Sequence, residues 1–202
     1  MTVEEKMRKN KIRNLTYLSL LIAVEIAMVC IPFLGFIPIG PLKATTLHIP
    51  VIIAGIVLGK KNGSILGLVF GLCSIFMNTI QPTITSFVFS PFLSGNILSA
   101  VIAIVPRVMI GYVSGYIYEL FKGKYTNTSI IISSLCGAMS NSILVLSGIY
   151  FIFGHQYANI IGKSLSALMP YFITIITTQS VLEAIVGTII AFAVSKALLR
   201  IK

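Results

Sequence analysis

The chain has 202 residues, of which 56% are hydrophobic and 10% are charged, and its mean hydropathy is +1.00. A soluble domain carries about 25% charged residues, so this composition excludes an ordinary soluble fold and predicts a polytopic membrane protein. The formal net charge of +10 does not indicate a nucleic-acid partner, because the basic residues cluster at the ends of apolar segments, as they do in membrane proteins.

The N-terminal residues 1–14 are basic and are predicted to form a cytoplasmic arm, which leaves residues 15–202 as the membrane domain. A first membrane span is expected at residues 15–36. Residues 37–44, which are rich in proline and glycine, are then expected to form an outer loop.

Two apolar runs, residues 45–59 and 64–78, flank a short hinge with the sequence KKNG. Lysine side chains are costly in hydrocarbon, so Lys60 and Lys61 mark one membrane face, and paired lysines in a short loop favour the cytoplasmic face. Each run would be about 22 Å long as a helix, which is short of the ~30 Å hydrocarbon core. Tilt or local thinning of the bilayer is therefore expected here.

The rest of the chain predicts three further spans. An outer segment at 79–94 is followed by a fourth span within 95–121, an inner turn at 123–127, a fifth span at 128–153, an outer loop at 154–164, and a sixth span from about Pro170 to Leu199. No polar turn lies near Pro106, so this proline is expected to kink or start the fourth helix and not to divide it.

Six spans place both termini on one side of the membrane, and the basic residues indicate which side. Twelve of the fifteen fall on the proposed inner side: Lys6, Arg8, Lys9, Lys11, Arg13, Lys60, Lys61, Lys122, Lys124, Lys196, Arg200 and Lys202. The sequence therefore predicts an all-α membrane protein, a bundle of six transmembrane helices with both termini in the cytoplasm.

The first span combines a carboxylate with a stripe of small residues. Ser19, Ala23 and Ala27 recur every four residues, and Glu25 lies about 200° away around the helix. We expect Glu25 to face protein or a wet cavity and the stripe to face outward, where a helix of another protein could dock closely. The alternative is that the stripe packs within this chain.

Polar residues inside a membrane are costly and therefore indicate candidate ligand contacts. The planar guanidinium of Arg107 suits a carboxylate or a phosphate, although an internal ion pair with Glu25 or Glu183 is the alternative. The predicted substrate-binding residues are Lys43, His48, Asn78, Asn96, Arg107, Asn141, Gln179 and Glu183.

The sequence holds no catalytic triad at a suggestive spacing and no phosphate loop. The two histidines are isolated, and the three cysteines show no paired spacing. We therefore expect no enzyme activity, no cofactor, no metal site and no ATP hydrolysis by this chain alone.

Several segments resemble the substrate-binding S components of energy-coupling factor (ECF) vitamin transporters. These are LHIPVIIAGIVLGKKNGSILGLVFGLCS at 47–74, the Ala23-x-x-x-Ala27 pair, AIVPRVMIGYVSGYIY at 103–118, GAMSNSILVLSGIY at 137–150 and VLEAIVGTIIA at 181–191. The first segment is the most specific, and the resemblance covers roughly residues 15–195.

The resemblance implies a six-helix subunit of a prokaryotic plasma membrane that captures a vitamin near its outer face. It also implies a transmembrane coupling protein and two ABC ATPases as partners, with the Ala-x-x-x-Ala surface of the first helix against the coupling protein. The pattern looks closest to pantothenate-type members, in which case Arg107 could bind the carboxylate of the vitamin. Folate, cobalamin, pyridoxine and thiamine precursors stay open.

A second function remains open from the sequence. A stand-alone secondary transporter could use Glu25 and Glu183 as proton carriers.

Overall fold

The computed structural model describes residues 3–31, 35–39, 42–123 and 126–201, without the side chains of Val3, 36–39 and 42–44. Apart from one hairpin it is helical. The elements are α1 (Val3–Cys30), β1 (Phe36–Ile39), β2 (Leu42–Thr45), α3 (Ile49–Leu58), α4 (Lys60–Ile80), the 3₁₀ turn η1 (Ser86–Val88), α5 (Pro91–Ser94), α6 (Leu98–Phe121), α7 (Thr126–Ile160), α8 (Leu165–Ile175), the π-helical turn η2 (Ile176–Ser180) and α9 (Val181–Ile201).

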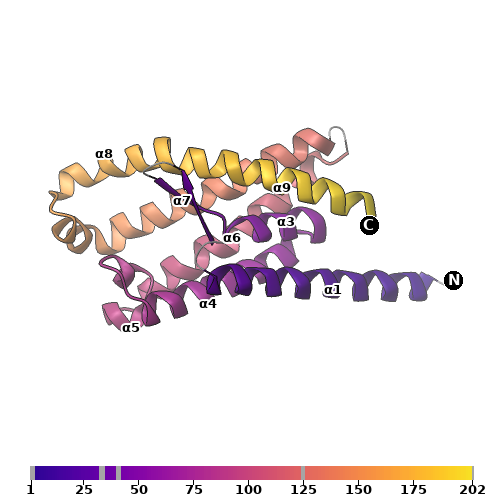
Figure 1. The fold of residues 1–202 in the computed structure, drawn as a ribbon, viewed down its shortest axis with the longest axis horizontal. Coiled ribbons are helices and arrows are strands. Elements are labelled where there is room, and N and C mark those ends of the chain that lie inside the picture. Colours follow the sequence, from indigo (N-terminus) through magenta and orange to yellow (C-terminus); the bar gives the residue numbers. More distant parts are fainter. Residues whose placement is uncertain (1–2, 32–34, 40–41, 124–125, 202) are drawn as a thin grey trace.

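The long helices run side by side along one axis (Figure 1). The start of α1, the end of α9, the α3–α4 turn and the adjoining ends of α6 and α7 lie at one end of the molecule, and α5, α8 and the α7–α8 connection lie at the other. Five helices among the described residues are long and apolar enough to cross a membrane: Glu4–Cys30, Lys60–Ile80, Leu98–Phe121, Thr126–Ile160 and Leu165–Ile201. The predicted all-α membrane protein is thus confirmed at this level.

The short helix α3 is the exception to the predicted spans. It has 10 residues, all of them buried, and it packs against α4, α6 and α9. A helix of this length covers about 15 Å, roughly half of the hydrocarbon core. Because α3 is enclosed by protein, it does not need to match the thickness of the lipid.

The predicted hinge at residues 60–63 is wrong. Lys60 and Lys61 already belong to α4, and the chain turns at the single residue Gly59, whose φ of +91° is a left-handed conformation that glycine adopts without strain. The two apolar runs are therefore unequal, with 10 and 21 helical residues. Lys60 still marks a helix end, where it pairs with Glu119 at 2.9 Å.

Two other boundaries differ from the predictions. The helix α1 continues without a break through residues 14 and 15, and the expected outer loop at 37–44 contains the antiparallel strands β1 and β2, with Phe36 opposite Thr45. At the other end of the chain, α7 extends to Ile160, well into the expected outer loop. The sixth span begins at Leu165, so that Pro170 lies inside α8.

Glycines bring α4 and α6 into close contact. A Cβ built on Gly67 would meet the backbone carbonyl of Arg107, and one built on Gly111 would meet the backbone of Gly63. Small residues allow helix backbones in membranes to approach in this way. The helix α6 is continuous through Pro106, as predicted, so its close contact with α4 also determines where Arg107 lies.

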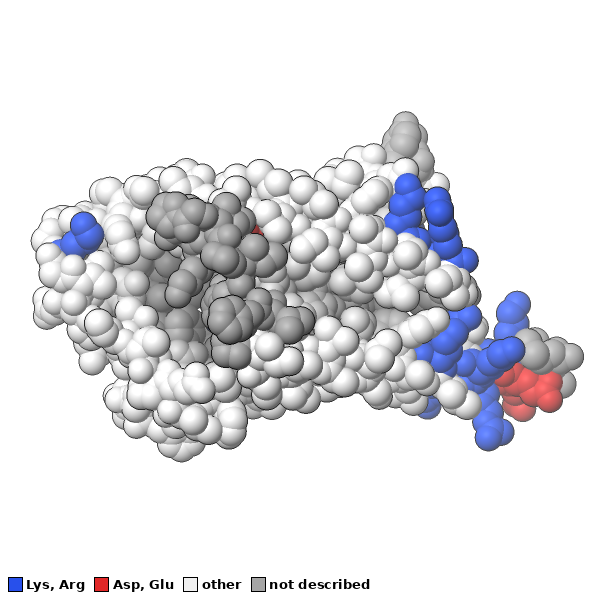
Figure 2. Space-filling view, viewed as in Figure 1, with Lys and Arg blue, Asp and Glu red and all other residues white. Residues whose placement is uncertain are grey.

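The charges are strongly segregated along the molecule. Figure 2 shows lysine and arginine side chains gathered mainly at the end that carries both termini, with a further basic group at the opposite end and mostly uncharged side chains among the described residues between the two ends. This distribution fits a bundle whose middle lies in hydrocarbon, with its basic end in the aqueous phase.

Candidate functional site

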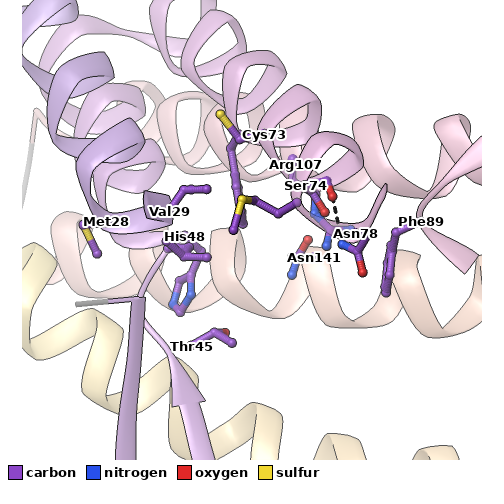
Figure 3. A pocket seen from close by; sticks show the side chains of 13 residues that line it. Met28, Val29, Thr45, His48, Cys73, Ser74, Asn78, Phe89, Arg107 and Asn141 are labelled. Atoms are coloured by element: carbon purple, nitrogen blue, oxygen red, sulfur yellow. Dashed lines mark hydrogen bonds between the residues drawn. The ribbon is translucent and has the colours of Figure 1, made fainter. Parts of the chain in front are cut away.

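A cavity of about 310 Å³ lies between α1, the end of the hairpin, α4, α6 and α7. Its polar lining consists of Thr45, His48, Ser74, Asn78, Arg107 and Asn141. Its apolar lining consists of Met28, Val29, Leu47, Phe70, Cys73, Met77 and Phe89 (Figure 3). Cavities of about 300–1,000 Å³ with a mainly apolar lining and a few polar groups are typical of small-molecule sites.

Arg107 is the one charged residue among the described residues of this lining. Its side chain is buried, and Nη1 donates a hydrogen bond to the Ile102 carbonyl at 3.1 Å. Its guanidinium carbon lies over the rings of Phe70 and Phe89, 5.5 Å and 4.9 Å from their centroids. Within the described part of the chain Nε has no hydrogen-bond partner, so the guanidinium keeps donors for a ligand.

The alternative of an internal ion pair for Arg107 does not occur among the described residues. Glu25 is buried on α1, and neither of its carboxylate oxygens has a hydrogen-bond partner in the described chain. The Glu183 carboxylate is bonded to Thr45 and Gln179 instead. Arg107 is therefore a buried cation without a carboxylate beside it, which is a costly state that an anionic ligand would relieve.

Two more polar atoms of the cavity wall lack partners within the described structure. They are Nε2 of His48 and Oδ1 of Asn141, and both are buried. His48 lies just before α3, and its ring packs so closely on Gly187 of α9 that a Cβ there would be 2.5 Å from Nε2. An unpaired buried polar group costs about 1–3 kcal/mol, so three of them around one cavity indicate a site that is completed by a ligand.

Asn78 is already held in place near the C-terminal end of α4. Its Nδ2 donates to the Ser74 carbonyl at 2.8 Å, and its Oδ1 accepts a hydrogen bond from the Ser86 hydroxyl at 2.7 Å. The bond from Ser86 connects η1 to α4. Together the two bonds leave Asn78 with fewer free hydrogen-bonding atoms for a ligand than Asn141 has.

The hairpin is joined to the last helix beside the cavity. The Thr45 hydroxyl donates to Oε2 of Glu183 at 3.0 Å, and Nε2 of Gln179 donates to Oε1 of Glu183 at 3.0 Å. Gln179 belongs to the π-helical turn η2, a kind of irregularity that is frequent at functional sites.

The structure gathers half of the predicted binding residues around the cavity, namely His48, Asn78, Arg107 and Asn141. Gln179 and Glu183 lie behind Thr45, outside the lining. Asn96 is distant and accepts a hydrogen bond from the Leu98 amide at the start of α6. The side chain of Lys43 lies outside the described residues.

The sequence did not single out Thr45 or the apolar lining residues as ligand contacts. Phe70 and Phe89 carry no signal in an apolar sequence, because aromatic residues in a membrane helix are ordinarily packing or lipid contacts. Thr45 could have been found from its position three residues before His48, just ahead of the most specific segment. Across the described chain, no group of three or more His, Cys, Asp or Glu side chains could hold a metal ion.

A second candidate surface lies on α1. Ser19, Ala23 and Ala27 are all exposed, whereas Glu25 is fully buried on the opposite side of the helix. This placement agrees with the predicted helix geometry and leaves the small residues available to another protein. The suggested packing of this stripe within the chain does not occur in the described structure.

The chain is similar to known proteins over most of its length. The profile of the family described as "ECF transporter, substrate-specific component" matches residues 13–195. The pantothenic acid transporter PanT of Lactococcus lactis subsp. cremoris is 32% identical over 201 residues, which cover 96% of this chain and 97% of that protein. The pantothenate transporter PanT of Leuconostoc mesenteroides subsp. mesenteroides is 27% identical over 205 residues, with 96% of each chain covered.

Proposed function

This chain belongs to the family of substrate-specific components of ECF transporters, and we propose that it is the membrane subunit that binds pantothenate for import. The family is a substrate-binding component of a transporter and not a catalyst. Two relatives that match over almost their whole length carry pantothenate in their names, which supports this substrate.

The observation that carries the proposal is the set of unpartnered polar atoms around one cavity. Nε of Arg107, Nε2 of His48 and Oδ1 of Asn141 are all buried and lack partners within the described structure. Pantothenate offers a carboxylate, an amide and two hydroxyl groups on a small aliphatic frame. These groups can satisfy a guanidinium, a carboxamide oxygen and an imidazole, while the dimethyl group fits the apolar wall.

The same proposal gives the protein a topology. We infer that the chain crosses the plasma membrane of a prokaryote six times, with α3 and the residues before it forming the short second crossing. Twelve of the fifteen basic residues then lie on the side of the two termini, which supports a cytoplasmic location for that end. The cavity is lined by the ends of α1 and α4 that lie away from the two termini.

We also infer the partners from the family. The exposed stripe of Ser19, Ala23 and Ala27 is proposed as the surface that meets a transmembrane coupling protein, and two ABC ATPases are proposed to supply the energy. Small residues on a lipid-facing helix let a second helix approach closely, which supports this assignment.

Ligand identification on purified protein tests the substrate. Thermal melting in detergent is measured with pantothenate, folate, cobalamin, pyridoxine and a thiamine precursor, each at the same concentration. Pantothenate alone should raise the melting temperature, because a ligand present at 100 times its Kd stabilises the folded state by about 2.7 kcal/mol. Stabilisation by another vitamin, with none by pantothenate, would contradict the proposal.

A further inference from the structure

We propose that the cavity binds pantothenate in a single orientation, with its carboxylate at Arg107 and its two hydroxyl groups at Thr45 and His48. We further propose that Glu183, acting through Thr45, excludes ligands that carry a phosphate at the hydroxyl end. This inference rests on the proposed function, and it assigns a selectivity role to a residue outside the cavity lining.

The cavity wall has two polar ends. Figure 3 shows Arg107, Asn141, Asn78 and Phe89 on one side of the cavity and His48 and Thr45 on the other. Among the described residues only the first end carries a formal charge, because the second end presents a hydroxyl and an imidazole. A ligand with an acid at one end and neutral hydroxyl groups at the other has the matching distribution of polarity.

The acid end is determined by Arg107. One of its five N–H groups is used by the Ile102 carbonyl, and the neighbouring rings of Phe70 and Phe89 offer no acceptor that competes with a carboxylate. Asn141 adds an unpartnered carbonyl oxygen near this end, which can accept from the amide N–H of the ligand. Arginine favours carboxylates, since its planar fork can bind both oxygens at once.

The hydroxyl end is determined by the partner of Thr45. The Thr45 hydroxyl donates its only proton to Oε2 of Glu183 at 3.0 Å, so its oxygen faces the cavity as an acceptor. Glu183 is itself fixed by the hydrogen bond from Gln179 at 3.0 Å. This end of the cavity therefore requires a ligand group that can donate a hydrogen bond, and a hydroxyl group does this beside the imidazole of His48.

A phosphate at this end is unfavourable for two reasons. Its oxygens are mainly acceptors and carry a charge of about −1.5 to −2 at neutral pH, so they cannot satisfy the acceptor side of Thr45. The Glu183 carboxylate lies directly behind that hydroxyl and repels a second anion. The site should thus take up the free vitamin and reject its phosphate ester, so phosphorylation of the hydroxyl would follow uptake.

The test measures equilibrium binding to the purified full chain with four ligands. These are pantothenate, pantothenol (in which an alcohol replaces the carboxylate), the analogue without the primary hydroxyl, and the phosphate ester of the primary hydroxyl. The variants are Arg107→Ala, Thr45→Val, Thr45→Ser and Glu183→Gln. Thr178→Val is the matched control, because its exposed hydroxyl donates to the Thr174 carbonyl one turn earlier and Thr178 is not among the described lining residues.

Each variant should affect only the ligands that carry the matching group. Arg107→Ala should weaken pantothenate by roughly 10- to 150-fold and pantothenol by less than about 3-fold. Thr45→Val should weaken pantothenate and pantothenol equally, by roughly 3- to 10-fold, and should leave the deoxy analogue unaffected. Thr45→Ser and Thr178→Val should bind like the wild type.

Glu183→Gln tests the exclusion of phosphate. The wild type should bind the phosphate ester at least about 100-fold more weakly than pantothenate, and Glu183→Gln should narrow this ratio about 10-fold or more, since it removes a nearby negative charge while keeping a hydrogen-bonding side chain. A purely structural role of Glu183 would weaken both ligands together and leave the ratio unchanged. That result would overturn the selectivity role.

Two other outcomes separate this inference from the proposed function. In the first outcome, the wild type binds pantothenate, Thr45→Val weakens pantothenate much more than pantothenol, and Arg107→Ala weakens both ligands equally. This result would mean that the ligand lies in the reverse orientation. In the second outcome, the wild type binds no pantothenate. The proposed substrate is then wrong, and so is the proposed orientation of pantothenate.

Discussion

Arg107 is costly to place inside a membrane domain, and its surroundings show how the protein tolerates it. The side chain is supported by a carbonyl at 3.1 Å and by two aromatic rings, but by no carboxylate in the described chain. Such support lowers the cost of the cation without neutralising it. This environment supports the proposal that Arg107 binds an anionic ligand.

Substitution of Arg107 should separate binding from stability. Arg107→Ala should lower pantothenate affinity by about 1.5–3 kcal/mol, or roughly 10- to 150-fold, and Arg107→Lys should recover only part of this loss, since an ammonium lacks the planar fork. The ligand-free melting temperature should change little, because no carboxylate is left unpaired. Titration calorimetry and thermal melting of the same samples provide both values.

The internal ion pair makes the opposite prediction. It requires Arg107→Ala to destabilise the ligand-free protein and Glu25→Gln or Glu183→Gln to restore that loss in the double variant. Such a recovery would show that Arg107 serves the fold and would weaken the case for an acidic substrate.

Polar residues of the site were predictable from the sequence, whereas apolar ones were not. His48, Arg107 and Asn141 stand out because polar groups are rare within membrane spans. Phe89 does not stand out, since its role depends on η1 folding back over the cavity, a tertiary arrangement with no local pattern. Gln179 was expected to touch the ligand; it is not among the described lining residues, and its Nε2 donates to Glu183 one turn away.

Close helix contact through glycine is the dominant feature at the scale of elements. Gly111 of α6 faces Gly63 of α4, and a Cβ on Gly111 would collide with the Gly63 backbone and approach the Ser64 nitrogen to 2.7 Å. These neighbours are backbone atoms, so they cannot move aside as a flexible side chain would. The separation of α4 and α6 is therefore set by the absence of side chains at this point.

Gly111→Ala should destabilise the bundle and disturb the site. The gain in helix propensity of about 1 kcal/mol is smaller than the overpacking cost of about 1–3 kcal/mol or more, and the helices must separate one turn from Arg107. Thermal melting without ligand should show a lower midpoint, and pantothenate affinity should fall. Gly123→Ala is the control, because a Cβ there meets nothing within 4 Å, and it should melt like the wild type. Equal melting of both variants would contradict this view of the α4–α6 contact.

Element types were predictable, but several boundaries were not. The apolar runs identify the helices, yet hydropathy does not distinguish a polar hinge from a polar first turn, so Lys60 and Lys61 were assigned to a loop. The chain turns at Gly59 because the φ angle of this one residue is positive, and the pattern of polar and apolar residues does not reveal a backbone angle. The hairpin β1–β2 was missed because its Pro-rich and Gly-rich sequence indicates a loop equally well.

At the scale of the whole molecule, the source of energy distinguishes the proposed function from a secondary transporter. The sequence contains no phosphate loop, so uptake should require partner ATPases and ATP. Proteoliposomes that hold the complete complex should accumulate labelled pantothenate when ATP is present, and collapse of the proton gradient should not stop this. Uptake by this chain alone, driven by a pH gradient, would instead support proton coupling through Glu25 and Glu183.

The last prediction concerns the surface that we propose for docking of a transmembrane coupling protein. Ala23 and Ala27 are exposed on α1, on the side opposite to the buried Glu25, so leucine at both positions adds bulk without entering the bundle. Close approach of a second helix would be blocked, since small residues at such interfaces let the backbones come together. The double variant should therefore lose assembly and uptake while it binds pantothenate like the wild type.

A matched control is available on another helix. Ala193 and Ala197 have the same spacing and are exposed on α9, so leucine at both positions tests whether added bulk alone disturbs the protein in the membrane. This control should assemble and transport normally in a co-purification and uptake assay. Loss of assembly in the α9 variant, with the α1 variant unaffected, would move the docking surface to α9. Loss of solitary pantothenate binding in the α1 variant would show instead that the stripe supports the fold, because a surface used only for docking does not change the affinity of the isolated subunit.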